Sequence, residues 1–458
     1  MDPTPIGRRP PRIERPRRAD TFVGAFPERR PERWGIPASY RTLFIKVRYR
    51  LVMPNSPAAA YPTPFGRYVR EIWPGDPGAY GGRRARRPFP FEAFVPVTLA
   101  DRDFVLTAQT AAAVQDATVA TVELNRLHRG NAALTALSTQ LLRSEALASS
   151  RIEGLELSHR RLARAQYEAY DRKAAEVVGN VRAMQQAIEL GEQARPLTTE
   201  DLCEIHATLL ASVYDAKIAG RVRGTQNWVG INASSPSGAE FVPPPARFVP
   251  ELLGDLCAFV EREDLPEIAQ AAVAHAQFET IHPYGDGNGR LGRCLIHLIL
   301  RRRAIAAHRV PPISLVLVRS RESYVAGLTA YRAGDVDGWI RASADATYTA
   351  AQAAATFAGR VEEQEERWLD QAGRPRAGSA ARIVIEHLPQ HPVLDGKTVQ
   401  RVAGCSDVAA LRALTRLEEA GVISPVREAR RNRVWECRVL FDLLNEFEDD
   451  PVRTTDDV

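Results

Sequence analysis

The chain has 458 residues, a net charge of +5 and a hydrophobic fraction of 45%, which is enough for two or three domains with buried cores. Its longest apolar runs, such as PPISLVLV, are much shorter than the ~18 residues of a membrane span, and no secretory signal is expected at the N-terminus. Alanine is abundant and strand-like runs are few, which predicts a mainly helical protein. Five cysteines without a C-x-x-C pair favour a reducing cytoplasm and no metal cluster: Cys203, Cys257, Cys294, Cys405 and Cys437.

Residues 1–90 differ in composition from the rest of the chain. They carry 19 Arg and Lys against 7 Asp and Glu, and 16 of the 32 prolines. The other 368 residues therefore have a net charge of −7. We expect a Pro- and Arg-rich disordered segment here, with residues 1–52 as a solvated tail. A polybasic tail can also contact nucleic acid or anionic lipid, and Met53 offers an alternative start of translation.

The chain is expected to become globular from PFEAFVP (Pro90–Pro96) onward. Residues 91–195 are predicted to form an N-terminal helical region, because apolar residues such as Leu134, Leu137 and Leu141 recur with a helical period. SRIEGLELSHRRLARAQYEAY continues in the same way. Residues 196–357 are predicted to form a second helical domain, whose first helix starts at TTEDLCEIHATLL with Thr198 or Thr199 as its cap.

The least helical part of this second domain is RVRGTQNWVGINASSPSGAEFVPPPARFVP. Trp228, Val229 and Ile231 precede a turn rich in Ser, Gly, Asn and Pro, and Phe241 and Val242 follow it. This pattern predicts a β-hairpin.

Residues 358–378 are predicted to be a long polar connector helix followed by the linker AGRPRAG, and residues 379–447 have a different character. Three short helices, the third capped by Ser406 and ended by Gly421, precede two strands, SPV and VWECRVL, around the basic turn REARRNR. This is the order of a winged helix-turn-helix, in which the basic residues of the turn can contact DNA: Arg427, Arg430, Arg431 and Arg433. Winged helices also mediate protein contacts, and a basic turn is often only solvated. An acidic tail is expected at residues 448–458.

The stretch HPYGDGNGRLGR, from His282 to Arg293, is the most informative part of the sequence. Three of its glycines fit G-x-G-x-x-G, but that pattern indicates dinucleotide binding only after a β-strand. The preceding PEIAQAAVAHAQFETI is Ala-rich and predicts a helix. The stretch is therefore expected to be a glycine-rich loop between two helices.

Such a loop can hold a phosphate, because backbone N–H groups at a helix start point outward and glycine allows close approach. Arg290 and Arg293 lie at i and i+3 of the following helix and can reach a polyphosphate. Asp286 is a hard oxygen ligand suited to Mg²⁺ beside phosphates, and His282 can act as a general base. Together these residues suit the attack of a hydroxyl on a nucleotide phosphate. A simple glycine-rich turn with solvated charges is the alternative, but the joint occurrence within twelve residues argues against it. The histidines without such neighbours are interpreted as packing or capping residues: His206, His275 and His297.

The same stretch resembles the signature of Fic-domain proteins, histidine–proline–aromatic–x–acid–glycine–asparagine–glycine–arginine–x–x–arginine, with Tyr284 in the aromatic position. RGTQNWVG and AEFVPPP resemble the substrate flap of that family, and SSRIEG resembles its inhibitory-helix motif, Ser/Thr-x-x-x-Glu-Gly/Asn. The likeness spans about Phe91 to Phe357. It implies a mainly α fold, with a Fic-type helical core and a small β-hairpin flap, followed by the winged helix.

The resemblance implies transfer of AMP from ATP to a hydroxyl of a protein side chain, with His282 as the base and Mg²⁺ on Asp286. It also implies that three residues bind the α- and β-phosphates, namely Gly287, Asn288 and Gly289, that Arg290 holds the phosphate tail and that Arg293 orients the γ-phosphate. The flap would dock a target segment as an added strand, through Val229, Gly230, Ile231 and Phe241.

The resemblance further implies intramolecular inhibition through Ser149, Glu153 and Gly154. Glu153 is expected to form a bidentate ion pair with Arg293 and to take the cation that the γ-phosphate needs. From spacing alone, Glu153 would instead be a capping or surface glutamate.

Two alternatives remain open at this point. Some members of the family remove AMP or transfer phosphate or phosphocholine with nearly the same residues, and Glu153 could position a water for removal. In the second alternative, the protein is a DNA-binding regulator that uses the Fic domain as a sensor. The expected partners are ATP, Mg²⁺, a protein bearing Ser, Thr or Tyr, DNA through the winged helix and a second copy of the chain, without a membrane.

Overall fold

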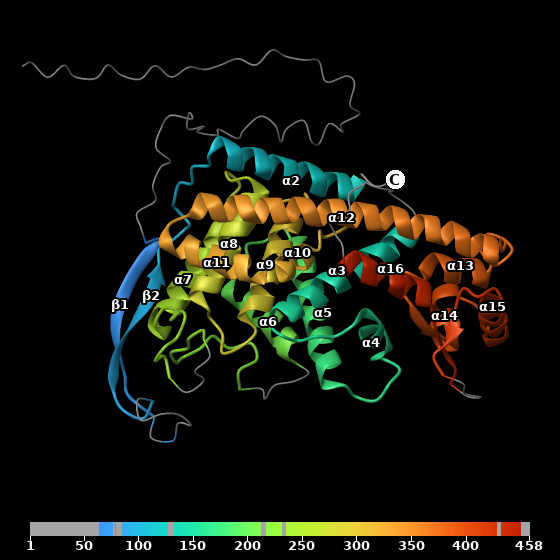
Figure 1. Cartoon of the computed structure of the whole chain (residues 1–458), viewed down its shortest axis with the longest axis horizontal. Helices are drawn as coiled ribbons and strands as arrows, with labels where there is room; N and C mark the ends of the chain where they lie inside the picture. Colours follow the sequence, from blue (N-terminus) through green and yellow to red (C-terminus); the bar gives the residue numbers. More distant parts are fainter. Residues whose placement is uncertain are drawn as a thin grey trace, which may run out of the picture. The chain divides into compact units, whose positions relative to one another are not determined.

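The computed structural model describes residues 64–76, 78, 85–126, 132–211, 217–230, 235–427 and 432–449. Its N-terminal two-thirds contain β1 (Gly66–Trp73), β2 (Phe89–Pro96), α2 (Ala108–Arg126), α3 (Ala132–Ile152), α4 (His159–Arg164), α5 (Arg172–Gly191), α6 (Thr199–Leu210), η1 (Ala246–Phe248), α7 (Val249–Val260), α8 (Glu267–Ile281) and α9 (Asn288–Arg302) (Figure 1). The rest contains α10 (Ile313–Arg319), α11 (Arg321–Ala333), α12 (Val336–Gln371), α13 (Ala380–His387), β3 (Val393–Asp395), α14 (Gly396–Ala403), α15 (Asp407–Glu419), β4 (Ser424–Pro425), β5 (Val434–Glu436) and α16 (Arg438–Asp449). The mainly helical fold expected from the sequence is therefore confirmed.

Several predictions concern residues that lie outside the described part of the chain. They are the solvated tail at residues 1–52, the flap residue Ile231, the turn residues Arg430 and Arg431, and the acidic tail from residue 450.

The first described strands correct the prediction that residues 1–90 form a disordered segment. β1 pairs with β2 in an antiparallel register that runs from Gly66↔Pro96 to Trp73↔Phe89. Phe65, which precedes β1, is fully buried, stacks edge-on against Tyr331 and donates its N–H to the carbonyl of Arg332. These tertiary contacts stabilise a strand that the Pro- and Arg-rich composition of the segment did not predict.

The longest helix, α12, lies alongside α2 and also packs against α8, α10 and α11 (Figure 1). It was expected to be a polar connector that begins near residue 358, but it begins at Val336 and runs without a break to Gln371. One face of it is buried, with Phe357, Val361 and Trp368 almost inaccessible to solvent. α12 is therefore part of the core rather than a spacer between two domains.

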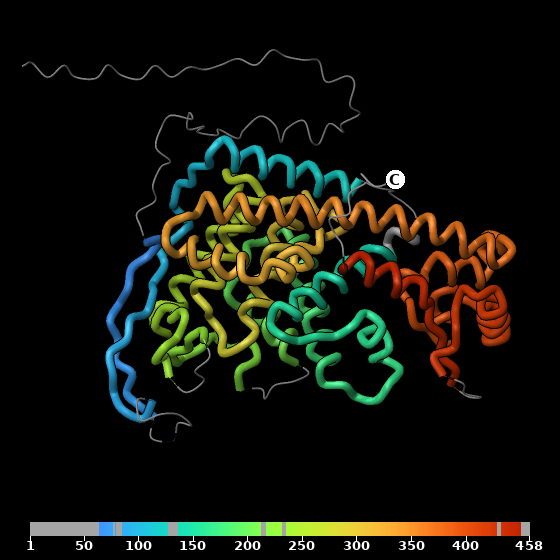
Figure 2. Tube along the Cα trace, viewed as in Figure 1, coloured from blue at the N-terminus to red at the C-terminus, as the bar shows by residue number. Residues whose placement is uncertain are grey.

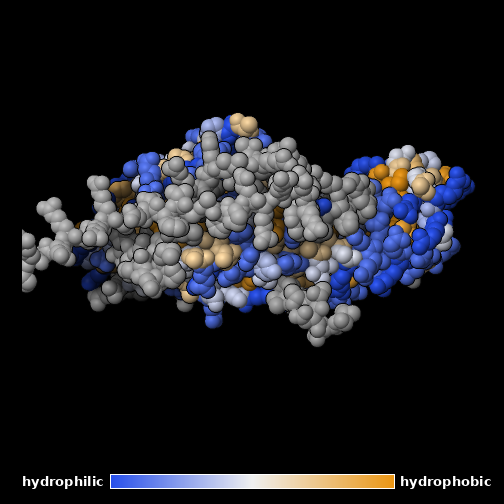
Figure 3. All heavy atoms as spheres, turned by 90° about the horizontal axis from the view of Figure 1, so that it is seen from above, coloured by the Kyte–Doolittle hydropathy of each residue, from blue (hydrophilic) through white to orange (hydrophobic). Residues whose placement is uncertain are grey.

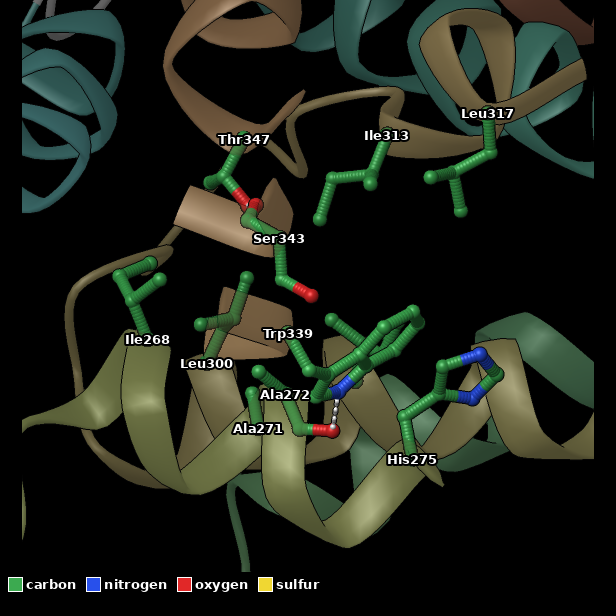
Figure 4. Close-up of a pocket in the computed structure, with 11 residues that line it drawn as sticks. Ile268, Ala271, Ala272, His275, Leu300, Ile313, Leu317, Trp339, Ser343 and Thr347 are labelled. Carbon is green, nitrogen blue, oxygen red and sulfur yellow. Dashed lines mark hydrogen bonds between the residues drawn. The ribbon is translucent and has the colours of Figure 1, made fainter. Parts of the chain in front are cut away.

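α8 lies at the centre of the fold and is buried on almost every side, in keeping with its Ala-rich sequence. It packs on α9, which in turn packs on α5. A void of about 20 Å³ remains between α8, α9, α10 and α12, where the Trp339 indole donates to the carbonyl of Ala272 at 2.8 Å (Figure 4). That space suits one water molecule rather than a ligand.

The C-terminal segment contains the three predicted helices and a small antiparallel sheet in the order β3-β5-β4. Ser406 caps α15 by accepting the N–H of Ala409, and Gly421 has a positive φ after its end, as predicted. VWECRVL is not a single strand, because β5 ends at Glu436 and α16 begins at Arg438. From Arg438 onward the apolar residues recur with a helical period, and this pattern favours a helix over the strand suggested by the β-branched residues before it. The buried apolar residues of α16 are Leu440, Phe441, Leu444 and Phe447. The winged helix-turn-helix stays a prediction.

This C-terminal segment shares a hydrophobic core with the helices before it. Leu137 and Leu141 of α3 and Phe357 of α12 belong to the same buried cluster as Ile385, Leu414 and Phe441. The Phe357 and Phe447 rings stack with centroids 4.6 Å apart. Figure 2 shows α12 running from the helical core to the C-terminal helices. On the face seen in Figure 3, the end formed by the C-terminal helices is mostly hydrophilic, with a few hydrophobic patches.

Candidate functional site

The stretch from His282 to Arg293 forms the expected helix–loop–helix. α8 ends at Ile281, and His282 adopts the left-handed conformation with φ 49° and ψ 59°. Gly287, with φ 77°, precedes the first residue of α9. A non-glycine residue in the left-handed region is strained, and such strain often occurs at functional sites. The loop therefore turns sharply at both ends.

Two side chains hold the loop from inside. The Asn288 side chain accepts the N–H of Tyr284 and donates to its carbonyl, both at 2.9 Å. His206 accepts the N–H of Gly220 at Nδ1, so its Nε2 carries the proton and donates to the carbonyl of Asp286 at 2.9 Å. The His206 ring also stacks on Tyr284, with centroids 3.9 Å apart. The Asn288 side chain therefore shapes the loop, and phosphate binding by Asn288 stays a prediction.

Arg223 and Asn227 fasten the same loop to the segment that leads into the predicted flap. Arg223 Nε donates to the carbonyl of His282 at 2.9 Å, and its Nη2 donates to the carbonyl of Pro244 at 2.6 Å. Asn227 Nδ2 donates to the carbonyls of His282 and Tyr284. Burial lowers the pKa of Arg223 to about 10, which leaves it charged at neutral pH. These residues stabilise the strained turn at His282.

The His282 side chain lies beside Glu279 of α8. Its Nδ1 is 3.3 Å from the backbone carbonyl of Glu279, which only accepts, so Nδ1 carries the proton and Nε2 is free to accept one. Burial lowers the pKa of His282 to about 4, which keeps the ring neutral at pH 7. The Glu279 carboxyl is buried, its Oε2 is 4.0 Å from His282 Nδ1, and burial raises its pKa to about 7.

Asp286 and Arg290 lie at the open side of the loop. Asp286 Oδ1 accepts the N–H of Gly287 at 2.6 Å and is 3.8 Å from Arg290 Nη2. Arg290 is almost fully buried, and its Nε has no hydrogen-bond partner in the part of the chain that the structure describes. A buried guanidinium with an unused donor is suited to an anionic ligand.

Arg293 is held by the end of α3. It is 1% exposed, its Nε donates to Ser149 Oγ, and its Nη2 donates to the Ser149 carbonyl and to Glu153 Oε1, each at 2.8 Å. The expected contact between Glu153 and Arg293 is therefore present, but one carboxylate oxygen makes it instead of a bidentate pair. Burial alone would lower the pKa of Arg293, but Glu153 and neighbouring acids raise it above its usual value.

The Glu153 carboxylate also lies against the first turn of α9. A Cβ atom on Gly289 would collide with Glu153 Oε1 and would lie 3.1 Å from Arg293 Nη1. Glycine at this position therefore allows an anionic group to approach the helix N-terminus closely. Gly154 follows with φ 81°, which ends α3 and directs the chain away.

Residues on both sides of Glu153 contact the helices α11 and α16. Glu448 accepts from Arg151 Nη2 at 2.8 Å, and its other oxygen lies 2.7 Å from His159 Nε2. Arg321 Nε donates to the carbonyl of Ile152 at 3.0 Å. Glu448 was predicted to belong to an acidic tail, but it lies in α16 and is mostly buried.

The predicted flap is less regular than a β-hairpin. Val229 and Phe241 form an isolated antiparallel bridge, with the Val229 N–H 2.8 Å from the Phe241 carbonyl. Gly230 follows with φ 146°, and Val229 is partly exposed. β2 adjoins this bridge, because Phe94 donates its N–H to the carbonyl of Val242 at 2.9 Å.

The basic residues predicted to contact DNA are only partly described. Arg427 is exposed. Arg433 Nη2 donates to both carboxylate oxygens of Glu418 at 2.8 Å, and its guanidinium lies over the Trp435 ring. Arg433 thus has a partner within the protein, and its contact with DNA stays a prediction.

His275 and His297 are buried core residues, as interpreted from the sequence. His275 Nε2 contacts the Tyr324 hydroxyl, and His297 Nε2 contacts Glu145 Oε1, both at 2.9 Å. His206 also packs, but it supports the loop directly. Sequence reasoning missed four residues around the site: Arg223, Asn227, Glu279 and Glu448. The first two stand in the stretch assigned to the flap, and Glu279 is three residues before His282.

Two segments of the chain match known families. Residues 196–300 match the Fic/DOC family, and residues 111–189 match the Fic/DOC family N-terminal region. Over 155 residues the chain is 32% identical to protein adenylyltransferase fic-1 of Caenorhabditis elegans. The matched stretch covers 33% of this chain and 27% of that protein. It is 35% identical over 92 residues to a probable protein adenylyltransferase of Aquifex aeolicus, covering 20% of this chain and 26% of that protein. The matched part thus spans about a quarter of these curated relatives.

Solved structures of Fic proteins are similar as well. A Fic family protein from Desulfovibrio desulfuricans has a TM-score of 0.45 and 20% identity, covering 73% of this chain and 97% of that chain. A fragment of Fic-1 from C. elegans has a TM-score of 0.45 and 26% identity, covering 56% of this chain and 74% of that chain. Two segments of the chain thus match Fic/DOC family models, and the complete loop signature lies within the segment of residues 196–300.

Proposed function

We propose that the chain is an autoinhibited protein adenylyltransferase, which transfers AMP from ATP to a Ser, Thr or Tyr hydroxyl of a target protein and of itself. The observation that carries this proposal is the contact between Glu153 and Arg293 at the N-terminus of α9. An anion already occupies the place where the loop can hold phosphate. The names of the similar proteins agree with AMP transfer.

His282 acts as the general base in this proposal. Its Nδ1–H is directed to the Glu279 carbonyl, so Nε2 takes the proton of the target hydroxyl as that hydroxyl attacks the α-phosphorus. The ring is neutral over the physiological range because burial lowers its pKa to about 4. Arg223 and Asn227 position the base by holding the carbonyl of His282.

The phosphates bind at the start of α9. The backbone of Gly287, Asn288 and Gly289 faces the α- and β-phosphates, Arg290 uses its unpartnered Nε on the phosphate tail, and Arg293 orients the γ-phosphate. Positioning the leaving pyrophosphate away from the attacking hydroxyl is the main task of these residues.

The donor set at the loop fits Mg²⁺. Asp286 is a partly exposed carboxylate beside the phosphate site, and in the described part of the chain no cluster of three His, Cys, Asp or Glu side chains could hold a metal by itself. Mg²⁺ commonly uses one or two carboxylates and completes its shell with phosphates and water. When bound, it would neutralise phosphate charge. Asp286 would hold it there, while the Gly287 N–H donates to the Oδ1 of this carboxylate.

Glu153 inhibits the enzyme by occupying Arg293. The γ-phosphate and the Glu153 carboxylate compete for one guanidinium, and ATP that binds without Arg293 lacks the correct placement of its α-phosphate. Because Ser149 and Glu153 belong to the same chain as the loop, the inhibition is intramolecular.

The segment around the Val229–Phe241 bridge docks the target. A single bridge leaves the backbone of this segment irregular, so an incoming extended peptide can pair with it as an added strand. Val229, Gly230, Ile231 and Phe241 are the residues proposed to contact the target.

Labelled ATP tests the proposal against its alternatives. Purified protein carrying Glu153→Gly is incubated with Mg²⁺ and ATP labelled in the α- or γ-phosphate. Protein labelled only from the α-phosphate supports AMP transfer, whereas label from the γ-phosphate would show phosphorylation. AMP removal would be indicated by release of AMP from pre-modified protein by the wild type and not by the Glu153→Gly variant.

DNA binding stays a second, untested prediction for residues 379–447. The exposed Arg427 favours it, while the pairing of Arg433 with Glu418 does not. A salt-dependent gel shift with genomic fragments would test it. No helix among the described residues combines the length and the apolar character of a membrane span.

A further inference from the structure

A cavity of about 450 Å³ lies between α3, α4, α5 and residues 390–393, which lead into β3. None of the residues that line it belongs to the His282–Arg293 loop. Its volume falls within the range of pockets that bind small molecules, roughly 300–1,000 Å³. The cavity is therefore a separate place where a ligand could bind.

Two arginines on the cavity wall have no carboxylate partner among the described residues. Arg143 of α3 is half-buried and donates from Nη1 to the carbonyl of Gln390 at 3.0 Å. Neither Arg143 nor Arg182 of α5 forms an ion pair with any residue that the structure describes. Burial lowers the pKa of Arg143, and a smaller effect of Tyr167 opposes this shift. A desolvated cation is costly unless an anion compensates it.

Asp171 is the only acidic residue among the described residues of the wall, and it cannot supply that anion. Asp171 Oδ2 accepts from Arg161 Nε at 2.6 Å, and its Oδ1 accepts the N–H groups of Lys173 and Ala174 as the N-cap of α5. His391 on the opposite wall has its pKa lowered to about 4, by burial first and then by Arg143, Arg401 and His387. The surroundings of the cavity are therefore electropositive.

Much of the remaining wall is apolar. Leu162, Val178, Val181 and Pro392 line the same space as the two arginines. A ligand that fits this combination has an anionic group for Arg143 and an apolar body for the aliphatic side chains.

We propose that this cavity is a binding site for a small organic anion, a carboxylate or phosphate on an apolar body, with Arg143 as its main anchor. Arg182 supplies a second positive charge at the rim. The site does not depend on the function proposed for the His282 loop. Arg143 and the inhibitory Glu153 are ten residues apart along α3 and its end, or about 15 Å at 1.5 Å per residue, so the bound anion contacts the inhibitory helix without reaching the nucleotide site.

Binding to the full chain tests the proposal, with 8-anilinonaphthalene-1-sulfonate as a fluorescent organic anion. We expect saturable binding that benzoate and phenyl phosphate displace and that neutral benzyl alcohol displaces much less. If benzoate displaces the probe at a lower concentration than phenyl phosphate does, the site prefers a carboxylate, and the reverse indicates a phosphate site. Displacement by either anion supports the proposal. Displacement by benzyl alcohol as strong as by benzoate would show a merely apolar surface and overturn it.

Variants locate the binding. Arg143→Gln should weaken the affinity at least about tenfold, which corresponds to ~1.4 kcal/mol. The matched control is Arg367→Gln, an exposed arginine of α12 that pairs with Glu363 and does not line the cavity. Arg182→Gln, at an exposed position, provides a second test if the Arg143 variant unfolds at a lower temperature. The proposal is wrong if both wall variants bind the probe as the control does.

Discussion

Glu153 and Arg293 are 140 residues apart in the sequence, and their side chains are joined by a hydrogen bond of 2.8 Å. The two partners are unequal, because Arg293 is 1% exposed whereas Glu153 is 38% exposed. Two further bonds to Ser149 keep the guanidinium in place, so the glutamate is the partner that can leave. If Glu153 inhibits as proposed, a small movement at the end of α3 would therefore relieve the inhibition without rebuilding the site.

Removal of the Glu153 carboxylate should increase AMP transfer. In Glu153→Gly, Arg293 stays bound to Ser149 and becomes available to the γ-phosphate. A charge-assisted bond is stronger than a surface pair, but the partial exposure of Glu153 limits its strength. We expect a rise of at least about tenfold, or ~1.4 kcal/mol, in incorporation from α-labelled ATP. Arg293→Ala should not reproduce the gain, and an unchanged rate in Glu153→Gly would contradict the inhibitory role.

His282→Ala should abolish transfer while ATP binding survives. In the proposed function the imidazole acts on the attacking hydroxyl, whereas α9 and its arginines hold the nucleotide. Loss of a general base typically lowers a rate by 10²–10⁴. The rate is best measured in the Glu153→Gly background, and ATP affinity is followed by calorimetry. Full activity in the double variant would assign the proton transfer to another group.

The parts of the site that could be predicted are those whose residues lie close together in the sequence. The loop motif could be interpreted because its base, acid and arginines occur within twelve residues. Arg223 and Asn227 could not be assigned roles, because they bind backbone carbonyls, which any sequence provides. The family resemblance, and not spacing, directed attention to Glu153, whose partner is far away in the chain.

Competing local patterns explain the errors in the fold. β1 lies in a Pro- and Arg-rich stretch, and its order depends on pairing with β2 and on the burial of Phe65. VWECRVL contains enough β-branched residues to suggest a strand, but the helical period of α16 begins within it. α12 appeared polar because its charged face dominates the composition, while its buried face uses small alanines and a few large residues.

Loss of the Glu448 charge should partly relieve the inhibition. Glu448 contacts Arg151 and His159, which lie on either side of Glu153, so Glu448→Gln should loosen the end of α3. We expect AMP transfer to rise by about two- to fivefold, less than in Glu153→Gly, since Ser149 and Glu153 are intact. Glu446→Gln is the matched control, because Glu446 lies on the same helix and pairs with the exposed Arg360. Equal rates of AMP transfer in the two variants would show that Glu448 does not contribute to the inhibition.

Glu279→Gln should change how the stability of the protein depends on pH. Burial raises the pKa of Glu279 from 4.5 to about 7, so the folded state binds its proton more tightly than the unfolded state does. Its protonated form stabilises the fold fully below about pH 4.5, and this contribution is lost as pH rises through 7. Glutamine keeps the shape without the ionisation. The free energy of unfolding of the variant, relative to wild type, should therefore increase by more than about 1 kcal/mol between pH 5 and pH 8, since one pKa unit corresponds to ~1.4 kcal/mol. Urea unfolding at the two pH values measures this difference, and a difference that does not change with pH would mean that Glu279 ionises normally in the folded protein.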